Sequence, residues 1–161
     1  MGSDDIEFVD DKLFELIADV TTLALNRQHP LFEIFLEQWN VAKKYLRQGK
    51  LELTGVGFYY SYLIPEPVTK LSIRRWVISD ISGWVNEESQ VAFFNIFIED
   101  GLLKTLEGCV IDEWPQAIHV YGVSGPLAKA NQVEREIQSL ISKNPGLACE
   151  LQQLQRVQKP T

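Results

Sequence analysis

The chain has 161 residues, of which 45% are hydrophobic, and its 22 acidic and 15 basic residues give a formal net charge of −7 at pH 7. This length and composition are typical of one globular domain whose core needs neither a metal ion nor a disulfide for stability. A negative net charge repels phosphate backbones, which excludes nucleic acid as an expected partner.

The acidic residues concentrate at the start of the chain, where seven of them and Lys12 fall among residues 1–19. Such a start lacks the basic and apolar regions of a signal peptide, and no apolar run approaches the roughly 20 residues of a membrane span. Cys109 and Cys149 are typical of reduced thiols. We therefore expect a cytoplasmic protein, away from membranes. The acidic end is either a solvated tail before a helix or a surface that meets a basic partner.

Apolar residues at helical spacing predict two helices at the amino-terminal end. The first covers residues 11–27, with Asp10 or Asp11 as its N-cap, and the second runs from Pro30 to Gly49. Each helix has one apolar face, which must be buried against another element.

From residue 51 to residue 123 the apolar pattern has a period of two, which predicts a sheet. The predicted strands cover residues 51–62, 70–78 with an extension to 84, 90–99, 102–110 and 118–123. Asp100-Gly101 is a strong hairpin signal. The run 90–99 is almost continuously apolar, which predicts a central strand that is covered on both faces.

The helical pattern returns after Gly125-Pro126, and Asn144-Pro145-Gly146 divides it into two helices. Strands that follow one another without crossover helices form an antiparallel sheet. The predicted fold class is α+β, with an antiparallel sheet of about five strands, two N-terminal helices packed on it and two C-terminal helices. We assign residues 1–125 to an α+β domain and residues 126–161 to a C-terminal helical appendage of that domain.

Known catalytic signatures are missing from the sequence. It contains no zinc-ligand spacing, no nucleophile elbow and no Walker loop. The pair Gly55 and Gly57 lies inside a predicted strand, where glycines mark a bulge or close packing. We therefore expect no metal, no cofactor and no catalytic residue, and a binding protein is favoured over an enzyme.

Glu107 and His119 are the candidate ligand contacts on predicted strands. Glu107 lies between apolar neighbours, so it either faces a ligand, lies on an exposed sheet face, or pairs with Lys104, Arg74 or Arg75. His119 alternates with other side chains on one strand face, and no second ligand lies at a recognised spacing from it.

A short loop gives the candidate partner contacts. Asp112 and Glu113 precede Trp114, and an aromatic anchor with charges at its rim is common at protein interfaces. Packing of Trp114 under the sheet is the alternative interpretation.

Three segments carry a resemblance to a known family: HPLFEIFLEQWN at residues 29–40, LELTGVGFYYSY at 51–62, and FIEDGLLKTLEG at 97–108, the last followed by Glu113-Trp114-Pro115. The chain resembles, over residues 28–123, small uncharacterised bacterial proteins with a TGVGFF-like strand and a DG-x-L-x-x-LEG hairpin followed by W-P. It departs from that pattern at Cys109, at residues 90–92 and in the helices beyond Gly125. The resemblance supports the fold and implies no chemistry, although some proteins of this kind are similar to immunity partners of bacterial toxins.

Three hypotheses follow. The leading one is a protein-interaction module, in its specific form an immunity-type inhibitor of a toxin, with an unidentified and basic protein partner. The alternative is a small-ligand-binding protein or enzyme with a pocket between sheet and helices around Glu107 and His119. The third is a homo-oligomer that assembles through the C-terminal helices.

Overall fold

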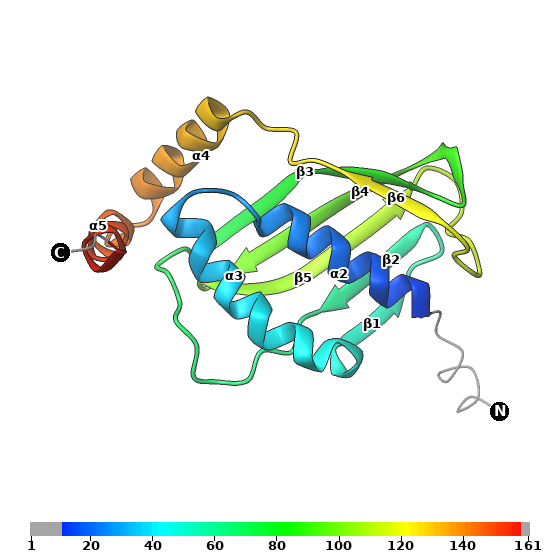
Figure 1. The fold of residues 1–161 in the computed structure, drawn as a ribbon, viewed down its shortest axis with the longest axis horizontal. Helices are drawn as coiled ribbons and strands as arrows, with labels where there is room; N and C mark the ends of the chain where they lie inside the picture. Colours follow the sequence, from blue (N-terminus) through cyan, green and yellow to red (C-terminus); the bar gives the residue numbers. More distant parts are fainter. Residues whose placement is uncertain (1–10, 159–161) are drawn as a thin grey trace.

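A computed structural model describes residues 11–158 and shows a six-stranded antiparallel sheet with two helices lying across one of its faces (Figure 1). The strand order is β1-β2-β5-β4-β3-β6. The strands are β1 (Lys50–Leu53), β2 (Gly57–Ser61), β3 (Arg75–Val85), β4 (Glu87–Glu99), β5 (Leu102–Val110) and β6 (Tyr121–Ser124). The helices are α2 (Asp11–Leu25), α3 (Pro30–Ala42), α4 (Ala130–Lys143) and α5 (Leu147–Gln158), and a 3-10 helix (Lys43–Gln48) follows α3. The predicted α+β class is confirmed.

The two N-terminal helices begin where the sequence predicts them, but both end earlier, and the second ends at Ala42, where the 3-10 helix Lys43–Gln48 replaces its predicted last turns. The first ends at Leu25, two residues earlier than predicted. The second begins at Pro30, and its N-cap is His29, whose Nδ1 accepts a hydrogen bond of 3.0 Å from the backbone N–H of Leu31. Proline suits the first helical turn because its missing N–H would be unpaired there in any case.

The strand predicted over residues 51–62 is in fact two strands, which is why the sheet has six strands rather than five. Gly55 has a φ of 90°, a conformation that favours glycine, and the backbone N–H of Thr54 donates to the carbonyl of Gly57 at 3.0 Å. The chain therefore turns at residues 54–56, and β1 pairs antiparallel with β2.

The hairpin predicted at Asp100-Gly101 is confirmed, and both residues have a positive φ, of 51° and 76°. It joins β4 to β5, whose bounds match the predicted strand. The last strand, predicted from residue 118, begins only at Tyr121 and pairs with β3 at the edge of the sheet.

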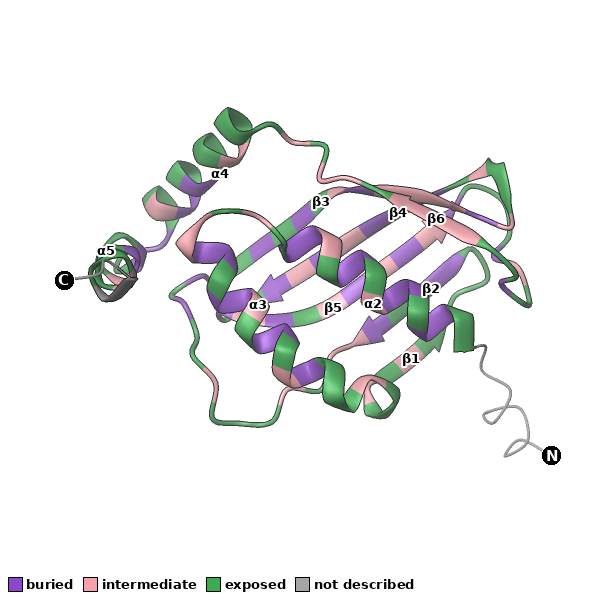
Figure 2. Cartoon of the chain, viewed as in Figure 1, coloured by how far each residue is buried: buried purple, intermediate pink, exposed green. Residues whose placement is uncertain are grey.

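The prediction that the apolar run 90–99 is covered on both faces is wrong. Its alternate residues differ in burial: Ala92 and Phe94 are buried on the helix side, whereas Val91 and Phe93 are 40% and 47% exposed (Figure 2). Helices α2 and α3 thus cover one face of the sheet and leave the other face open.

A buried glutamine fixes α3 on the sheet. The side-chain amide of Gln38 donates to the carbonyl oxygens of Thr69 at 2.9 Å and Gly101 at 2.8 Å, and its Oε1 accepts from the backbone N–H of Leu103 at 2.9 Å. All three partners are backbone groups, which lose free energy when they are buried without a hydrogen-bond partner.

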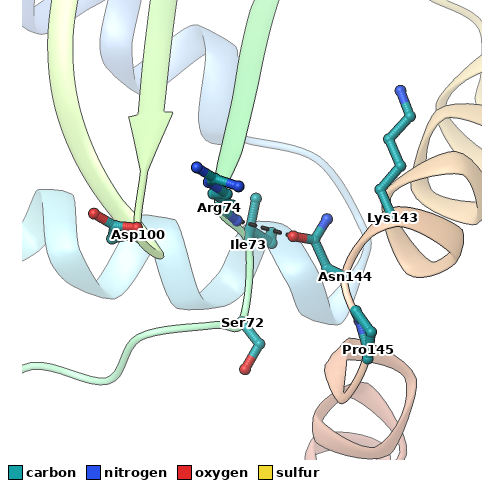
Figure 3. Close-up of a pocket in the computed structure, with 7 residues that line it drawn as sticks. All are labelled: Ser72, Ile73, Arg74, Asp100, Lys143, Asn144 and Pro145. Atoms are coloured by element: carbon teal, nitrogen blue, oxygen red, sulfur yellow. Dashed lines mark hydrogen bonds between the residues drawn. The ribbon is translucent and has the colours of Figure 1, made fainter.

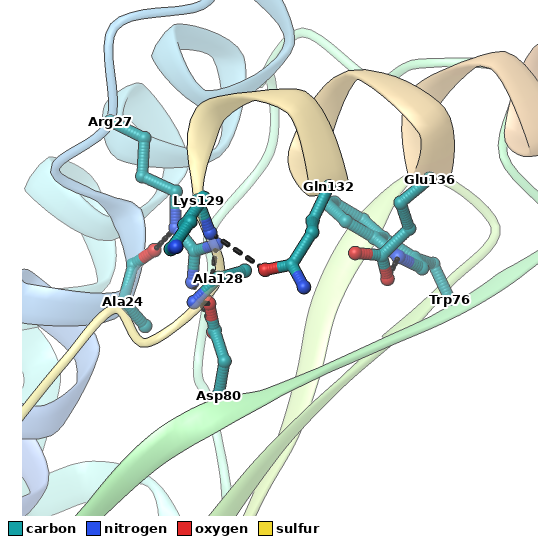
Figure 4. Close-up of polar contacts among 8 residues, drawn as sticks. All are labelled: Ala24, Arg27, Trp76, Asp80, Ala128, Lys129, Gln132 and Glu136. Atoms are coloured by element: carbon teal, nitrogen blue, oxygen red, sulfur yellow. Dashed lines mark hydrogen bonds and ion pairs between the residues drawn. The ribbon is translucent and has the colours of Figure 1, made fainter.

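The C-terminal helices share the core of the rest of the chain. Their apolar residues belong to the same buried cluster as those of α2 and α3, and the fully or nearly buried members are Ile137, Leu140, Leu147 and Leu151. The indole N–H of Trp76 in β3 also donates to Glu136 of α4 at 2.7 Å (Figure 4).

An ion pair holds the segment that leads into α4. Arg27, at the end of α2, donates two hydrogen bonds to the carboxylate of Asp80 in β3, one of them 2.9 Å long (Figure 4). The same carboxylate accepts from the backbone N–H of Ala128 at 3.1 Å. Three distant parts of the chain therefore meet at one partly buried charge pair.

Candidate binding face

The face of the sheet opposite α2 and α3 is the candidate site. Residues that lie directly opposite each other on neighbouring strands share a face, so the register defines its membership. We call this surface the open face, and its residues on the four inner strands include Tyr59, Ser61, Arg75, Val77, Ser82, Trp84, Val91, Phe93, Asn95, Phe97, Glu99, Thr105, Glu107 and Cys109.

The open face is rich in exposed apolar side chains. Tyr59 and Val77 are each 39% exposed, and Val91 and Phe93 are exposed to a similar degree. Single exposed apolar residues are normal, but four on one sheet face, with Phe97 and Trp84 half-buried among them, form a surface of the kind that binds other proteins.

Glu107 carries the negative charge in the middle of the open face. In the register it lies between Tyr59 of β2 and Asn95 of β4. Its Oε1 accepts a hydrogen bond of 2.9 Å from the side-chain amide of Asn95, and Tyr59 lies directly across from it on the other side, close enough for the carboxylate to raise the pKa of the Tyr59 hydroxyl. The predicted alternative of a pair with Lys104, Arg74 or Arg75 is not realised, because no cation of residues 11–158 forms an ion pair with it.

The charge of Glu107 acts on two neighbouring side chains. The hydrogen bond to Glu107, followed by the charge of the same carboxylate, raises the pKa of the Tyr59 hydroxyl. Burial and, secondly, the charge of Glu107 raise the pKa of the Cys109 thiol. Both residues therefore stay uncharged near neutral pH, and Glu107 is the negative group among them.

Trp114 does not offer a surface anchor. Its ring packs edge-on against Phe58, with centroids 5.3 Å apart, and its side chain is buried. Its backbone N–H donates to the carbonyl of Gly55 at 2.8 Å. The structure thus places Trp114 under the sheet, the second of the two predicted alternatives, whereas Asp112 and Glu113 beside it are exposed.

His119 and Glu107 do not form the expected pocket between sheet and helices. Glu107 lies on the face that the helices leave open. His119 is exposed in the loop before β6, where its backbone N–H donates to Asn86 Oδ1 at 2.7 Å. Neither residue lines any of the cavities described below.

Two acidic residues near the amino-terminal end of the chain make contacts with later parts of the same chain. Asp11 forms an ion pair of 2.7 Å with Arg47, and Asp19 accepts a hydrogen bond from the hydroxyl of Tyr121. The remaining acidic residues before residue 11 lie outside the described part of the chain.

A cavity of about 350 Å³ lies between the start of β3 and the turn from α4 to α5 (Figure 3). The backbone N–H of Arg74 donates to Asn144 Oδ1 across it at 2.9 Å. The ammonium of Lys143 and the hydroxyl of Ser72 point away from each other and from this bond (Figure 3). Polar groups that diverge do not make a ligand site.

A second cavity, of about 430 Å³, lies between the α2–α3 connection and the start of α4. His29 Nε2 lies 3.9 Å from Glu134 Oε2 at its wall. Burial lowers the pKa of His29, and the charges of Glu134 and Glu33 oppose this change. A third cavity, of about 290 Å³, lies where Leu71 and Lys70 meet α5.

Metal and membrane features were sought over the described part of the chain. Within residues 11–158, no three histidine, cysteine or acidic side chains are placed to hold a metal ion. None of the helices in this range has the length and apolar character that crossing a membrane requires.

Comparisons with protein-family models, with curated proteins and with solved structures found no match for this chain. The resemblance to small bacterial proteins therefore stays an expectation from the sequence. The sequence did not predict the open face, because the apolar run 90–99 indicated a strand covered on both faces. The polar residue Asn95 within the apolar run of β4 was the available sign that one face of that strand meets water.

Proposed function

We propose that the protein is a protein-interaction module whose partner binds to the open face. The observation that supports this most strongly is the uncovered face of a six-stranded sheet, on which Tyr59, Val77, Val91 and Phe93 are exposed. Large aromatic side chains give protein interfaces most of their binding energy. The cavity between β3 and the α4–α5 turn, in contrast, lacks convergent polar groups of the kind that orient a small ligand.

The charge of this face favours a different protein over a second copy of the chain. Glu107 lies on β5, between the strands that carry Tyr59 and Phe93. A two-fold axis through the middle of the face would bring two Glu107 carboxylates together, and juxtaposed like charges oppose association. A basic partner has no such conflict, and the net charge of −7 would accelerate its approach.

The specific form of the proposal is an immunity-type protein that neutralises a toxin by binding it. A binding role without catalysis agrees with the absence of known catalytic signatures from the sequence. Assembly through the C-terminal helices receives less support, because their apolar residues Ile137, Leu140, Leu147 and Leu151 are already buried within the chain.

A binding experiment with two matched variants tests the proposal. Immobilised wild-type protein is exposed to a lysate of its own host, and the retained proteins are compared with those retained by Phe93→Asp and Tyr45→Asp. Tyr45 is a suitable control because it is 39% exposed but lies in the 3-10 helix after α3. We expect one stoichiometric protein that wild type and Tyr45→Asp retain and Phe93→Asp releases.

Equal retention by all three proteins would show that the partner binds elsewhere and would contradict the proposal. A concentration-dependent dimer of the purified chain that Phe93→Asp abolishes would contradict it as well, since a second copy would then occupy the face. The immunity-type form predicts in addition that wild-type protein, but not Phe93→Asp, abolishes the activity of the retained partner at a one-to-one ratio.

A further inference from the structure

We infer that the open face receives an arginine side chain of the partner, whose guanidinium pairs with Glu107 beside the ring of Tyr59. This inference rests on the proposed function and specifies the partner's chemistry. It starts from a half-buried carboxylate that accepts a hydrogen bond from Asn95 on one side and faces Tyr59 on the other, but has no ion pair with a cation among the described residues.

Glu107 retains room for a further ligand. An ionised carboxylate has about four lone-pair sites, and the side-chain amide of Asn95 occupies one of them. This hydrogen bond also orients the carboxylate, so a partner would meet an oriented acceptor. Orientation before binding reduces the entropy lost when the pair forms.

No charged residue lies directly across from Glu107 on either neighbouring strand. The residues directly across from Glu107 are the uncharged Tyr59 and Asn95, and Cys109 follows it on the same face of β5. When an apolar partner covers this face, Glu107 loses water and must gain a positive charge, because an unpaired buried charge opposes binding. The apolar surroundings thus make a cation necessary and do not merely permit one.

The neighbouring carboxylate and bases agree with this assignment. Glu52 of β1 lies directly opposite Tyr59, so the row across the strands carries two negative charges with the tyrosine between them. Lys50 and Arg75 belong to the same face but lie in other cross-strand rows. The row through Glu107 therefore attracts a cation that the chain itself does not supply.

Arginine fits this position better than lysine. Its planar guanidinium pairs with a carboxylate through two parallel hydrogen bonds and stacks on aromatic rings, whereas the ammonium of lysine is a strongly hydrated point charge. Tyr59 offers an exposed ring next to Glu107, and Phe93 lies on the diagonal across β4 and β5. Apolar residues of the partner that flank this arginine in its sequence would cover Val91 and Phe93.

The test uses a short peptide as the probe. The full chain, labelled with 15N, is titrated with acetyl-Val-Arg-Val-amide and, separately, with the same peptide carrying citrulline, which has the shape of arginine without its charge. We expect the arginine peptide to shift the amide resonances of Tyr59, Phe93, Asn95 and Glu107. Citrulline should weaken the binding about tenfold, the effect of losing one charge-assisted contact.

Two variants assign the effect to the carboxylate. Glu107→Gln keeps an oxygen that accepts from the Asn95 amide but removes the charge. Its affinity for the arginine peptide should therefore be about tenfold lower than that of wild type and equal to its affinity for the citrulline peptide. Glu37→Gln removes an exposed charge from α3, on the other side of the sheet, and should leave the titration unchanged. Equal binding by wild type and Glu107→Gln, or equal binding of the two peptides, would overturn the inference.

Failure here can be separated from failure of the proposed function. If Phe93→Asp releases the protein partner but the peptides do not distinguish wild type from Glu107→Gln, the open face binds a partner and the arginine assignment is wrong. If the peptide binds Glu107 but Phe93→Asp and Tyr45→Asp retain the same partners, the arginine assignment stands and the docking face of the protein partner is wrong.

Discussion

The side-chain amide of Gln38 in α3 donates a hydrogen bond of 2.8 Å to the carbonyl of Gly101, in the turn between β4 and β5. This contact joins the helix layer to the hairpin that carries much of the open face. Gln38 also bonds Thr69 and Leu103, so a single buried side chain serves three backbone groups.

Replacing Gln38 by leucine should therefore destabilise the fold. The leucine is of similar size but removes the side-chain partner of three backbone groups, and each buried polar group left unpaired costs roughly 1–3 kcal/mol. We expect the free energy of unfolding in urea to fall by about 3 kcal/mol or more. Gln48→Leu, at an exposed position, should change it by less than about 0.5 kcal/mol. A similar small change for Gln38→Leu would mean that water satisfies these groups.

Trp114 should contribute to stability and not to binding. Its burial against Phe58 predicts that Trp114→Ala lowers the free energy of unfolding by about 3–5 kcal/mol, the usual cost of removing a buried tryptophan. Ile111→Ala is the control in the same loop, since Ile111 is 80% exposed and should matter little. If Trp114→Ala has the stability of wild type but no longer binds the partner, Trp114 is a partner contact and this prediction is wrong.

Substitutions of Arg27 and Asp80 should have strongly non-additive effects on the free energy of unfolding. Arg27 has a side chain only 9% exposed, so Asp80→Asn leaves a buried guanidinium without its countercharge. Breaking such a pair typically costs about 3–5 kcal/mol. The double variant Arg27→Met with Asp80→Asn should recover part of this loss, because the unpaired charge is gone. Additive losses in urea unfolding would show that the two residues act independently.

Much of the fold could be predicted because local patterns and tertiary structure agree. The hairpin at Asp100-Gly101 needs two residues with a positive φ, and its position follows from residue type alone. The helices follow from their apolar stripes and from Pro30. The division of residues 51–62 at Gly55 was missed because the alternating pattern continues through the turn, and only the pairing of β1 with β2 reveals it.

The candidate site was harder to predict, because a sequence gives the period of a strand but not which of its faces meets water. The apolar run of β4 has large side chains on both faces, so it matches a strand buried on both. The sequence singles out Glu107 because a charge among apolar residues needs an explanation. Its neighbours Tyr59 and Asn95 come from strands β2 and β4, and only the sheet order brings them together.

His29 should make the stability of the fold depend on pH. Burial lowers its pKa below the ordinary value of 6.5, and its Nδ1 must be unprotonated to accept the bond from Leu31. As the pH falls below about 6.5, the unfolded chain takes up a proton before the folded chain does, so stability is complete above this pH and declines below it.

The measurement compares the free energy of unfolding at about pH 7.5 and about pH 5.5 in wild type and in His29→Asn. Asparagine is a good N-cap that does not titrate, so the variant should lose less stability on acidification. His119→Asn is the control, because His119 is exposed in a loop. An identical loss in wild type and His29→Asn would mean that other groups cause the dependence.

The last prediction concerns the thiol beside Glu107. Because the charge of Glu107 helps to raise the pKa of Cys109, Glu107→Gln should lower that pKa and increase the thiolate fraction at mildly alkaline pH. The rate of alkylation by iodoacetamide reports the thiolate, and a Cys149→Ser background removes the exposed second cysteine. We expect Glu107→Gln to react faster than its parent and Glu37→Gln to react at the parent's rate. An unchanged rate would show that burial alone determines the pKa of Cys109, and that the Glu107 charge on the open face is weaker than a receptor for arginine requires.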